Sequence, residues 1–196
     1  FMGNVEWSRD GRSLLFPGWS NDDSRPGLFR ISLRDLTIEP VHPLGERTGA
    51  NWKGAYVNLR WLPLAGRYMV ARLLGQTGQE LYLMDPTDYR MERVGDTFDI
   101  SSWGIPSPDG RHLVAMLPAQ KSFALLSLPD GASKILCPYS PEELPAFAWS
   151  TDGKKLVWGE QGVLKVYSVA DGTVQTPVDA GQNKRIGGGL DGGTPN

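Results

Sequence analysis

The chain has 196 residues, of which 40% are hydrophobic and 21% charged, and its formal net charge is −2 at pH 7. This balance offers no basic surface for a nucleic-acid backbone, and no apolar run reaches the roughly 20 residues that a membrane-spanning helix needs. The single cysteine, Cys137, excludes an internal disulfide and a cysteine-based metal cluster. Residues 1–4 lack the charged start and apolar stretch of a signal peptide, so no signal peptide is predicted here, and whether a leader or a membrane anchor was removed stays open at this point.

Four segments repeat one pattern of a short run, a tight turn and an apolar strand. In chain order they are VEWSRDGRSLLF from Val5, LRWLPLAGRYMVA from Leu59, GIPSPDGRHLVAM from Gly104 and FAWSTDGKKLVWG from Phe147. Their turn glycines, at positions 11, 66, 110 and 153, are 55, 44 and 43 residues apart. Each glycine is followed by Arg or Lys, one further residue and an apolar triplet, which predicts a β-hairpin.

Two further short runs follow each hairpin. The first are LFRISLRD, LYLMDPTD, FALLSLPD and LKVYSVAD, and the second are TIEPV, MERV, SKIL and VQTPV. Each unit therefore holds four predicted strands in about 43 residues, the size of one β-propeller blade. The predicted blades cover about 4–41, 57–94, 103–136 and 146–178 of a propeller domain spanning 1–178, and a flexible Gly-rich tail follows at 179–196.

The predicted fold class is all-β, a β-propeller with four visible four-stranded blades. Such a propeller either closes with four blades or is part of a larger one. In an open propeller, the outer faces of the first and last blades would expose apolar surface to water, which is unfavourable. We therefore favour a chain that is part of a larger propeller or assembly, in which more chain or another subunit covers these faces.

The turn residues are interpreted as structural rather than catalytic. Glycine accepts a positive φ, and the preceding Asp and Ser can bond nearby backbone N–H groups. This role is predicted for Asp10, Gly11, Gly66, Asp109, Gly110, Asp152 and Gly153.

The phrases WSRDG, PSPDG and WSTDG, followed by a basic residue and an apolar strand, resemble the repeats of TolB-like propellers. The same repeat occurs in the propeller domains of prolyl oligopeptidases. The second unit departs from the pattern, because WLPLAG has no Asp-Gly pair and one extra residue. The resemblance implies a propeller fold and favours an extracytoplasmic setting in the bacterial periplasm.

No catalytic, metal or cofactor site is predicted. The chain has no G-x-S-x-G nucleophile elbow and only two histidines, His42 and His112. The acidic cluster NDDS at 21–24 lacks the spacing of a calcium loop. We therefore expect a protein that is not an enzyme.

We expect the binding surface to lie at the connections between strands that differ in length from one unit to the next. Long connections are predicted at 17–27, 42–56, 95–102 and 137–146, all on one face of the propeller, and long loops on a rigid scaffold commonly carry function. Aromatic and arginine side chains dominate protein interfaces, so the predicted contacts there are Trp19, Arg25, Arg47, Trp52, Lys53 and Trp103. The alternative is that these tryptophans fold back as local cores.

The function predicted from these observations is a non-catalytic protein-binding propeller that acts as a scaffold or accessory subunit of a larger assembly, and membrane-associated assemblies are included in this prediction. Its partners would be other proteins or a further propeller chain, with no nucleic acid and no membrane span in this chain. One alternative is the gating domain of a serine peptidase whose catalytic domain is absent from this chain. Another is a carbohydrate- or small-ligand-binding propeller that uses the loop tryptophans as stacking platforms.

Overall fold

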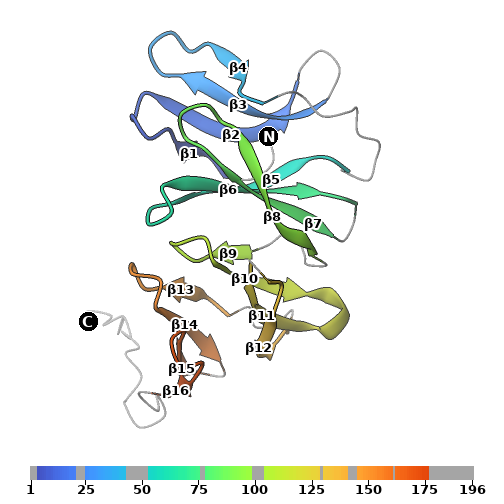
Figure 1. Cartoon of the computed structure of the whole chain (residues 1–196), viewed down its shortest axis with the longest axis vertical. Coiled ribbons are helices and arrows are strands. Elements are labelled where there is room, and N and C mark those ends of the chain that lie inside the picture. The colour runs from blue at the N-terminus through green and yellow to red at the C-terminus, as the bar shows by residue number, and fades with distance from the viewer. Residues whose placement is uncertain are drawn as a thin grey trace, which may run out of the picture.

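A computed structural model describes residues 4–20, 25–42, 53–75, 78–98, 104–128, 130–140, 145–160 and 162–176. The described residues form four antiparallel sheets of four strands, each in chain order (Figure 1). The all-β prediction with four four-stranded blades is therefore confirmed.

Each sheet is one blade. Blade 1 contains β1 (Glu6–Trp7), β2 (Ser13–Trp19), β3 (Pro26–Ser32) and β4 (Ile38–Pro40), and blade 2 contains β5 (Tyr56–Leu62), β6 (Arg67–Leu73), β7 (Gln79–Met84) and β8 (Met91–Phe98). Blade 3 contains β9 (Gly104–Pro106), β10 (His112–Leu117), the 3₁₀ turn η1 (Pro118–Gln120), β11 (Ser122–Ser127) and β12 (Ser133–Pro138). Blade 4 contains β13 (Phe147–Trp149), β14 (Lys155–Glu160), β15 (Val163–Ser168) and β16 (Val174–Gln175).

The tight turns lie at one end of the strands and the longer connections at the other. We call these ends the turn face and the loop face; they are on the left and right of blades 1 and 2 in Figure 1. The turn face holds the first-to-second and third-to-fourth strand connections of each blade.

The blades stack face to face in chain order, and three apolar clusters hold them together. Leu15 and Leu28 of blade 1 meet Tyr68 and Met84 of blade 2 in the first cluster. Blades 2 and 3 share a second cluster, and blades 3 and 4 share a third around Trp158. Alternating side chains point to opposite faces of a strand, so each inner blade contributes to two clusters.

Blades 1 and 4 lie at opposite ends of the stack (Figure 1). Among the described residues, these two blades share none of the three clusters. The four blades therefore form an open array, in which the outer faces of blades 1 and 4 are not covered by one another.

The strands run further into the predicted long connections than we expected. The connection predicted at 17–27 is wrong at both ends, because β2 continues to Trp19 and β3 begins at Pro26. Pro17 pairs with Leu28, whose carbonyl accepts from the Val41 amide on the far side of β3. Pro17 thus stands at a pair that exchanges no hydrogen bond with β3, where its missing N–H does no harm.

Two other predicted connections are also shorter than expected. Strand β8 continues past Val94 to Phe98, and β12 includes Cys137 and ends at Pro138. Gly95 has φ +62°, and the β7–β8 register shifts between Gln79 and Leu81. A bulge with glycine in the left-handed conformation lets a strand continue where its sequence looks like a break.

Candidate binding surfaces

The repeated turns of blades 1, 3 and 4 have the same hydrogen bonds. In blade 4 the Ser150 hydroxyl donates to Asp152 Oδ1 at 2.6 Å and accepts from the Lys155 amide at 2.9 Å. Asp152 Oδ1 also accepts from the Lys154 amide at 3.0 Å, and these bonds hold the carboxyl pKa below its usual value of 3.8. The serine and aspartate are thus engaged in closing the hairpin, with Gly153 at φ +70°.

The other predicted turn residues occupy equivalent places. Asp10 and Asp109 accept from the hydroxyl of the serine two residues before them and from the amide two residues after them. The turn glycines have φ between +64° and +70°: Gly11, Gly66, Gly110 and Gly153.

The predicted contact residues at the loop face are only partly described. Trp19 is half-buried and packs against the cluster between blades 2 and 3, while Arg25 and Lys53 are exposed. Arg47, Trp52 and Trp103 lie outside the described residues, as does the tail at 179–196. Trp19 thus contacts an apolar cluster, and the described residues among the predicted contacts do not form one continuous surface patch.

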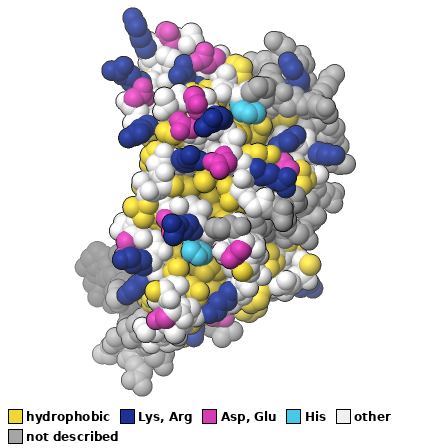
Figure 2. All heavy atoms as spheres, in the orientation of Figure 1, with side chains coloured by type: hydrophobic (Ala, Val, Ile, Leu, Met, Phe, Trp, Pro, Cys, Tyr) yellow, Lys and Arg dark blue, Asp and Glu magenta, His cyan; other side chains and the backbone are white. Residues whose placement is uncertain are grey.

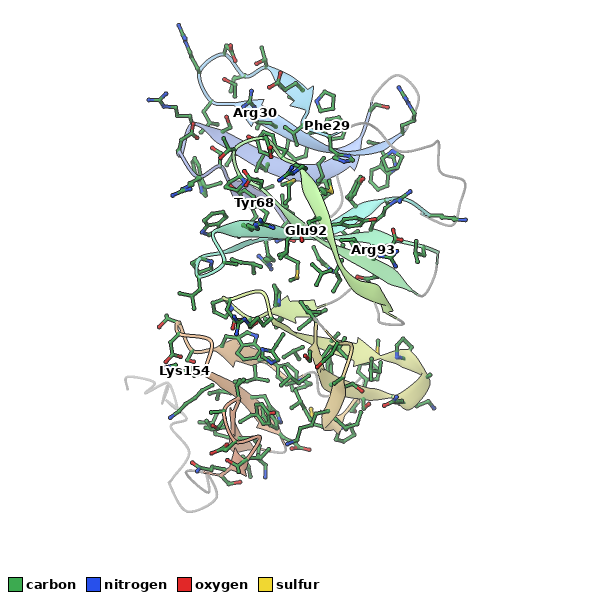
Figure 3. All side chains as sticks on the ribbon, viewed as in Figure 1. Phe29, Arg30, Tyr68, Glu92, Arg93 and Lys154 are labelled. Atoms are coloured by element: carbon green, nitrogen blue, oxygen red, sulfur yellow. The ribbon has the colours of Figure 1, made fainter. Side chains whose placement is uncertain are left out.

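A polar cluster at the loop-face end of blade 2 was not predicted. Glu80, with 15% of its side chain exposed, lies 3.5 Å from Arg72 Nη1 and 3.5 Å from Arg93 Nη1. The Tyr82 hydroxyl donates to Glu80 at 2.9 Å, and burial together with this bond raises the pKa of Tyr82. Arg93 is seen on β8 in Figure 3. Only the register of three strands brings these side chains together.

The face of blade 1 that points away from blade 2 is apolar. Cross-strand pairing places Trp7, Leu14, Ile31 and Ile38 in one row across all four strands. Trp7 is 60% exposed and Ile38 is 61% exposed. The next row holds Phe16 stacked on Phe29, with ring centroids 5.9 Å apart. We call these two rows the blade 1 outer face.

The equivalent row in every other blade is covered by the preceding blade. In blade 2 it contains Trp61 and Tyr68, which pack against blade 1, and in blade 4 it contains Trp149 and Leu156, which pack against blade 3. Trp149 Nε1 also donates to the Ile105 carbonyl at 3.3 Å. Figure 3 shows Tyr68 at the boundary between blades 1 and 2, where its hydroxyl donates to the Trp7 carbonyl at 2.7 Å.

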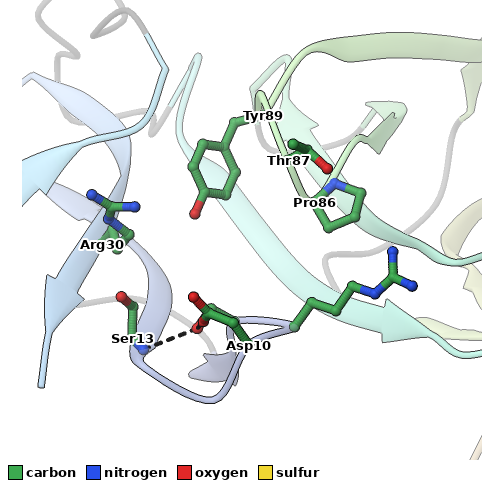
Figure 4. A pocket seen from close by; sticks show the side chains of 8 residues that line it. Asp10, Ser13, Arg30, Pro86, Thr87 and Tyr89 are labelled. Carbon is green, nitrogen blue, oxygen red and sulfur yellow. Dashed lines mark hydrogen bonds between the residues drawn. The ribbon is translucent and has the colours of Figure 1, made fainter.

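A polar pocket of about 460 Å³ lies between blades 1 and 2 at the turn face (Figure 4). Blade 1 lines it through the β1–β2 turn and Arg30, and blade 2 through the β7–β8 turn. The lining residues are Ser8, Arg9, Asp10, Ser13, Arg30, Pro86, Thr87 and Tyr89.

Arg30 is the central side chain of this pocket. It forms an ion pair with Glu39, and interaction with the Tyr89 hydroxyl across the blade boundary raises the pKa of its guanidinium. Its Nε is buried and has no hydrogen-bond partner among the described residues. Figure 4 shows the Arg30 guanidinium, the Tyr89 hydroxyl and the Asp10 carboxylate around one space.

Sequence reasoning missed this pocket, although a signal was present. Arg30 interrupts the apolar run of LFRISL, where the corresponding runs of blades 2 and 3 have leucine. A charged residue at a repeat position that is otherwise aliphatic marks an environment that differs between blades.

Charges elsewhere are mixed in sign. Figure 2 shows Lys and Arg interspersed with Asp and Glu on the visible face. In the described part of the chain, no group of three or more His, Cys, Asp or Glu side chains is placed to hold a metal ion. No helix among those same residues is long and apolar enough to cross a membrane.

Comparisons with known proteins place the fold. The sequence matches no protein family and no curated protein. The structure is similar to oligogalacturonate lyase in complex with manganese, with a TM-score of 0.59 and 13% identity over 85% of this chain. It is also similar to TolB from Acinetobacter baumannii, with a TM-score of 0.54 and 20% identity over 84% of this chain.

A third similar structure is the Cps50 (Swd1) β-propeller domain of Myceliophteria thermophila, with a TM-score of 0.54 and 14% identity over 88% of this chain. The fold is a β-propeller fold. At these identities the similarity concerns the fold alone. The chain spans 40% of the TolB chain, 47% of the lyase chain and 54% of the Swd1 domain.

Proposed function

We propose that this chain is a non-catalytic, protein-binding propeller unit that acts as a scaffold or accessory subunit of a larger assembly. The observation that carries the proposal is the blade 1 outer face. Trp7 and Ile38 are 60% and 61% exposed there, whereas the equivalent Trp61 and Met91 of blade 2 are half-buried against blade 1. A contiguous apolar surface of this kind is typical of a protein contact.

The repeat indicates what this surface binds. In blades 2, 3 and 4 the same row of side chains packs against the preceding blade. The contacted side of that preceding blade is the one that points toward the next blade in chain order, and we call it the rear face. Equivalent side chains on an equivalent backbone favour an equivalent partner, so the occupant we propose is the rear face of another propeller blade. The aromatic and branched side chains of the blade 1 outer face lie on a sheet, and sheets commonly pack face to face. Another blade is therefore a more suitable partner for this face than a helix or a membrane.

The rear face of blade 4 offers a surface of the required type. Val157 pairs with Val166, and Gly159 pairs with Leu164, which is 46% exposed. Small and aliphatic side chains there complement the bulky Trp7 and Phe16 of the blade 1 outer face. In solution, the isolated chain is therefore expected to associate head to tail through these two faces.

Analytical ultracentrifugation of the 21.5-kDa chain across a range of concentrations tests the proposal. We expect masses above the monomer that rise with concentration, and a monomer for the double variant Trp7→Lys/Ile38→Lys. Leu64→Lys is the matched control, since Leu64 is 56% exposed on the β5–β6 turn, away from the blade 1 outer face. A wild-type chain that stays monomeric to its solubility limit would contradict the proposal, as would equal effects of the control.

A further inference from the structure

Two residues that line the pocket between blades 1 and 2, Arg30 and Tyr89, differ from the residues at the same positions of blades 3 and 4. Cross-strand registers place Arg30 at the same position as Leu83, Leu125 and Val166 of the other blades. Leu125 is 5% exposed in the cluster between blades 3 and 4, and Leu83 packs against the cluster between blades 2 and 3. An aliphatic side chain therefore fills this space in blades 2 and 3, and a guanidinium stands there in blade 1.

The second of these residues is Tyr89. All four turns between third and fourth strands close with a backbone N–H that donates to the carbonyl four positions earlier, and the donor residue has a positive φ. Gly131 and Gly172 take this position in blades 3 and 4, with φ +70° and +68°, whereas Leu36 in blade 1 has φ +56° and Tyr89 in blade 2 has φ +57°. This conformation disfavours a bulky side chain, and here it aims the phenol at Arg30 across the blade boundary.

The lining favours a ligand that accepts hydrogen bonds and carries one negative charge. Arg9 and Arg30 contribute two positive charges and Asp10 contributes one negative charge, while the Glu39 carboxylate, which does not line the pocket, already pairs with Arg30. The Asp10 carboxylate already accepts from the Ser8 hydroxyl and the Arg12 amide, so it adds little as an acceptor for a ligand. The hydroxyls of Ser13, Thr87 and Tyr89 supply neutral hydrogen-bonding groups around the same space.

We propose that this pocket binds a carboxylate, with Arg30 as the anchoring cation and Tyr89 as the hydroxyl that completes the site from blade 2. A guanidinium recognises a carboxylate through parallel N–H···O bonds, and because Glu39 already offsets one positive charge beside the pocket, a carboxylate monoanion suits the site better than a phosphate dianion. The volume of about 460 Å³ is in the range of small-molecule sites. The proposal does not depend on the blade 1 outer face, which is on the opposite side of that sheet.

The carboxylate has two possible sources, a small polyhydroxy acid or the end of a peptide. Gluconate is the probe for the first source. A four-residue peptide with a free carboxyl terminus, compared with the same peptide amidated, is the probe for the second. Isothermal titration of the full chain with each probe, and with inorganic phosphate, measures the affinity.

The repeat itself supplies the variants. Arg30→Leu introduces the residue of blades 2 and 3, and Tyr89→Gly introduces the residue of blades 3 and 4, so both are compatible with the blade. We expect wild-type binding of gluconate or of the free peptide, and at least a tenfold loss of affinity in each variant. Arg12→Leu is the control, because Arg12 is an exposed arginine of the same β1–β2 turn that does not line the pocket.

Several results would overturn the proposal. These are no binding of either carboxylate probe, unchanged affinity in Arg30→Leu, equal loss in Arg12→Leu, and tighter binding of phosphate than of both carboxylates. If circular dichroism shows that Arg30→Leu does not fold, the affinity of the Tyr89→Gly variant is used instead, and unchanged affinity in that variant overturns the proposal. Binding of gluconate supports a free ligand and binding of the unamidated peptide supports a peptide, and either result supports the carboxylate site.

Discussion

Replacing one turn glycine by alanine should separate the cost of backbone conformation from the cost of blade packing. Gly110 has φ +70°, and a Cβ built on it would lie 2.9 Å from Leu62 Cδ1 of the neighbouring blade. Gly11 and Gly66 have φ +67° and +64°, but a Cβ on either meets nothing within 4 Å. The three positions share a turn type and differ in their surroundings.

The magnitudes follow from that difference. Alanine in the left-handed region costs about 1–2 kcal/mol, which is the expected loss in free energy of unfolding for Gly11→Ala and Gly66→Ala. Gly110→Ala should cost about 1–3 kcal/mol more, because Leu62 is 2% exposed and cannot swing away without disturbing its neighbours. Its total cost is therefore about 2–5 kcal/mol.

Urea unfolding followed by tryptophan fluorescence measures these free energies in the three variants. The double variant Gly110→Ala/Leu62→Val provides the internal check, since valine lacks the Cδ1 methyl group that causes the clash. We expect its cost to be smaller than the sum of the two single variants. Equal costs for all three glycines, or strict additivity in the double variant, would refute the packing argument.

Three further predictions concern ionisation and buried groups. The carboxylates of Asp10 and Asp152 have lowered pKa values, so the stabilisation that they contribute is present above pH 4 and is lost as the pH falls through those values. Asp152→Asn should therefore flatten the acid side of a plot of melting temperature against pH, and an unchanged plot would contradict this. Burial raises the pKa of Tyr68 to about 12, so the stability that its neutral hydroxyl contributes to the fold is lost as the pH rises from 10 to 12. Tyr68→Phe should remove this loss of stability at high pH. At pH 7 the same variant should lower the free energy of unfolding by about 1–3 kcal/mol, because it leaves the Trp7 carbonyl unpaired. Burial also raises the pKa of Cys137 to about 11, so a thiol reagent at pH 8 should label it only when urea unfolds the chain, and rapid labelling of the folded protein would show that the thiol is accessible.

Several features of the fold were predictable because they depend on local sequence. The positions of Gly11, Gly66, Gly110 and Gly153 predicted the hairpins, and the alternating runs around them predicted the strands. The four-blade, all-β architecture follows from counting these units, and the structure confirms it. Strand ends were less predictable, because Pro17 and Gly95 look like breaks and are accommodated by the register of neighbouring strands.

The candidate sites were harder to predict than the fold. Trp19 looks like a loop contact in the sequence, yet it lies at the end of β2 and packs against the cluster between blades 2 and 3. The Glu80 cluster and the Arg30 pocket were missed because their members come from different strands or different blades. Contacts between side chains far apart in the chain depend on pairing register, which no local pattern records.

The sequence by itself determined the repeat, the hairpin turns and the β class, because turn chemistry and strand alternation act over a few neighbouring residues. Only the tertiary structure decided which copies of the repeat are covered. Trp7 and Trp149 occupy the same position in their units, but Trp149 packs against blade 3 and Trp7 is 60% exposed. The same side chain is a core residue or a surface for a partner according to whether a preceding blade lies against it.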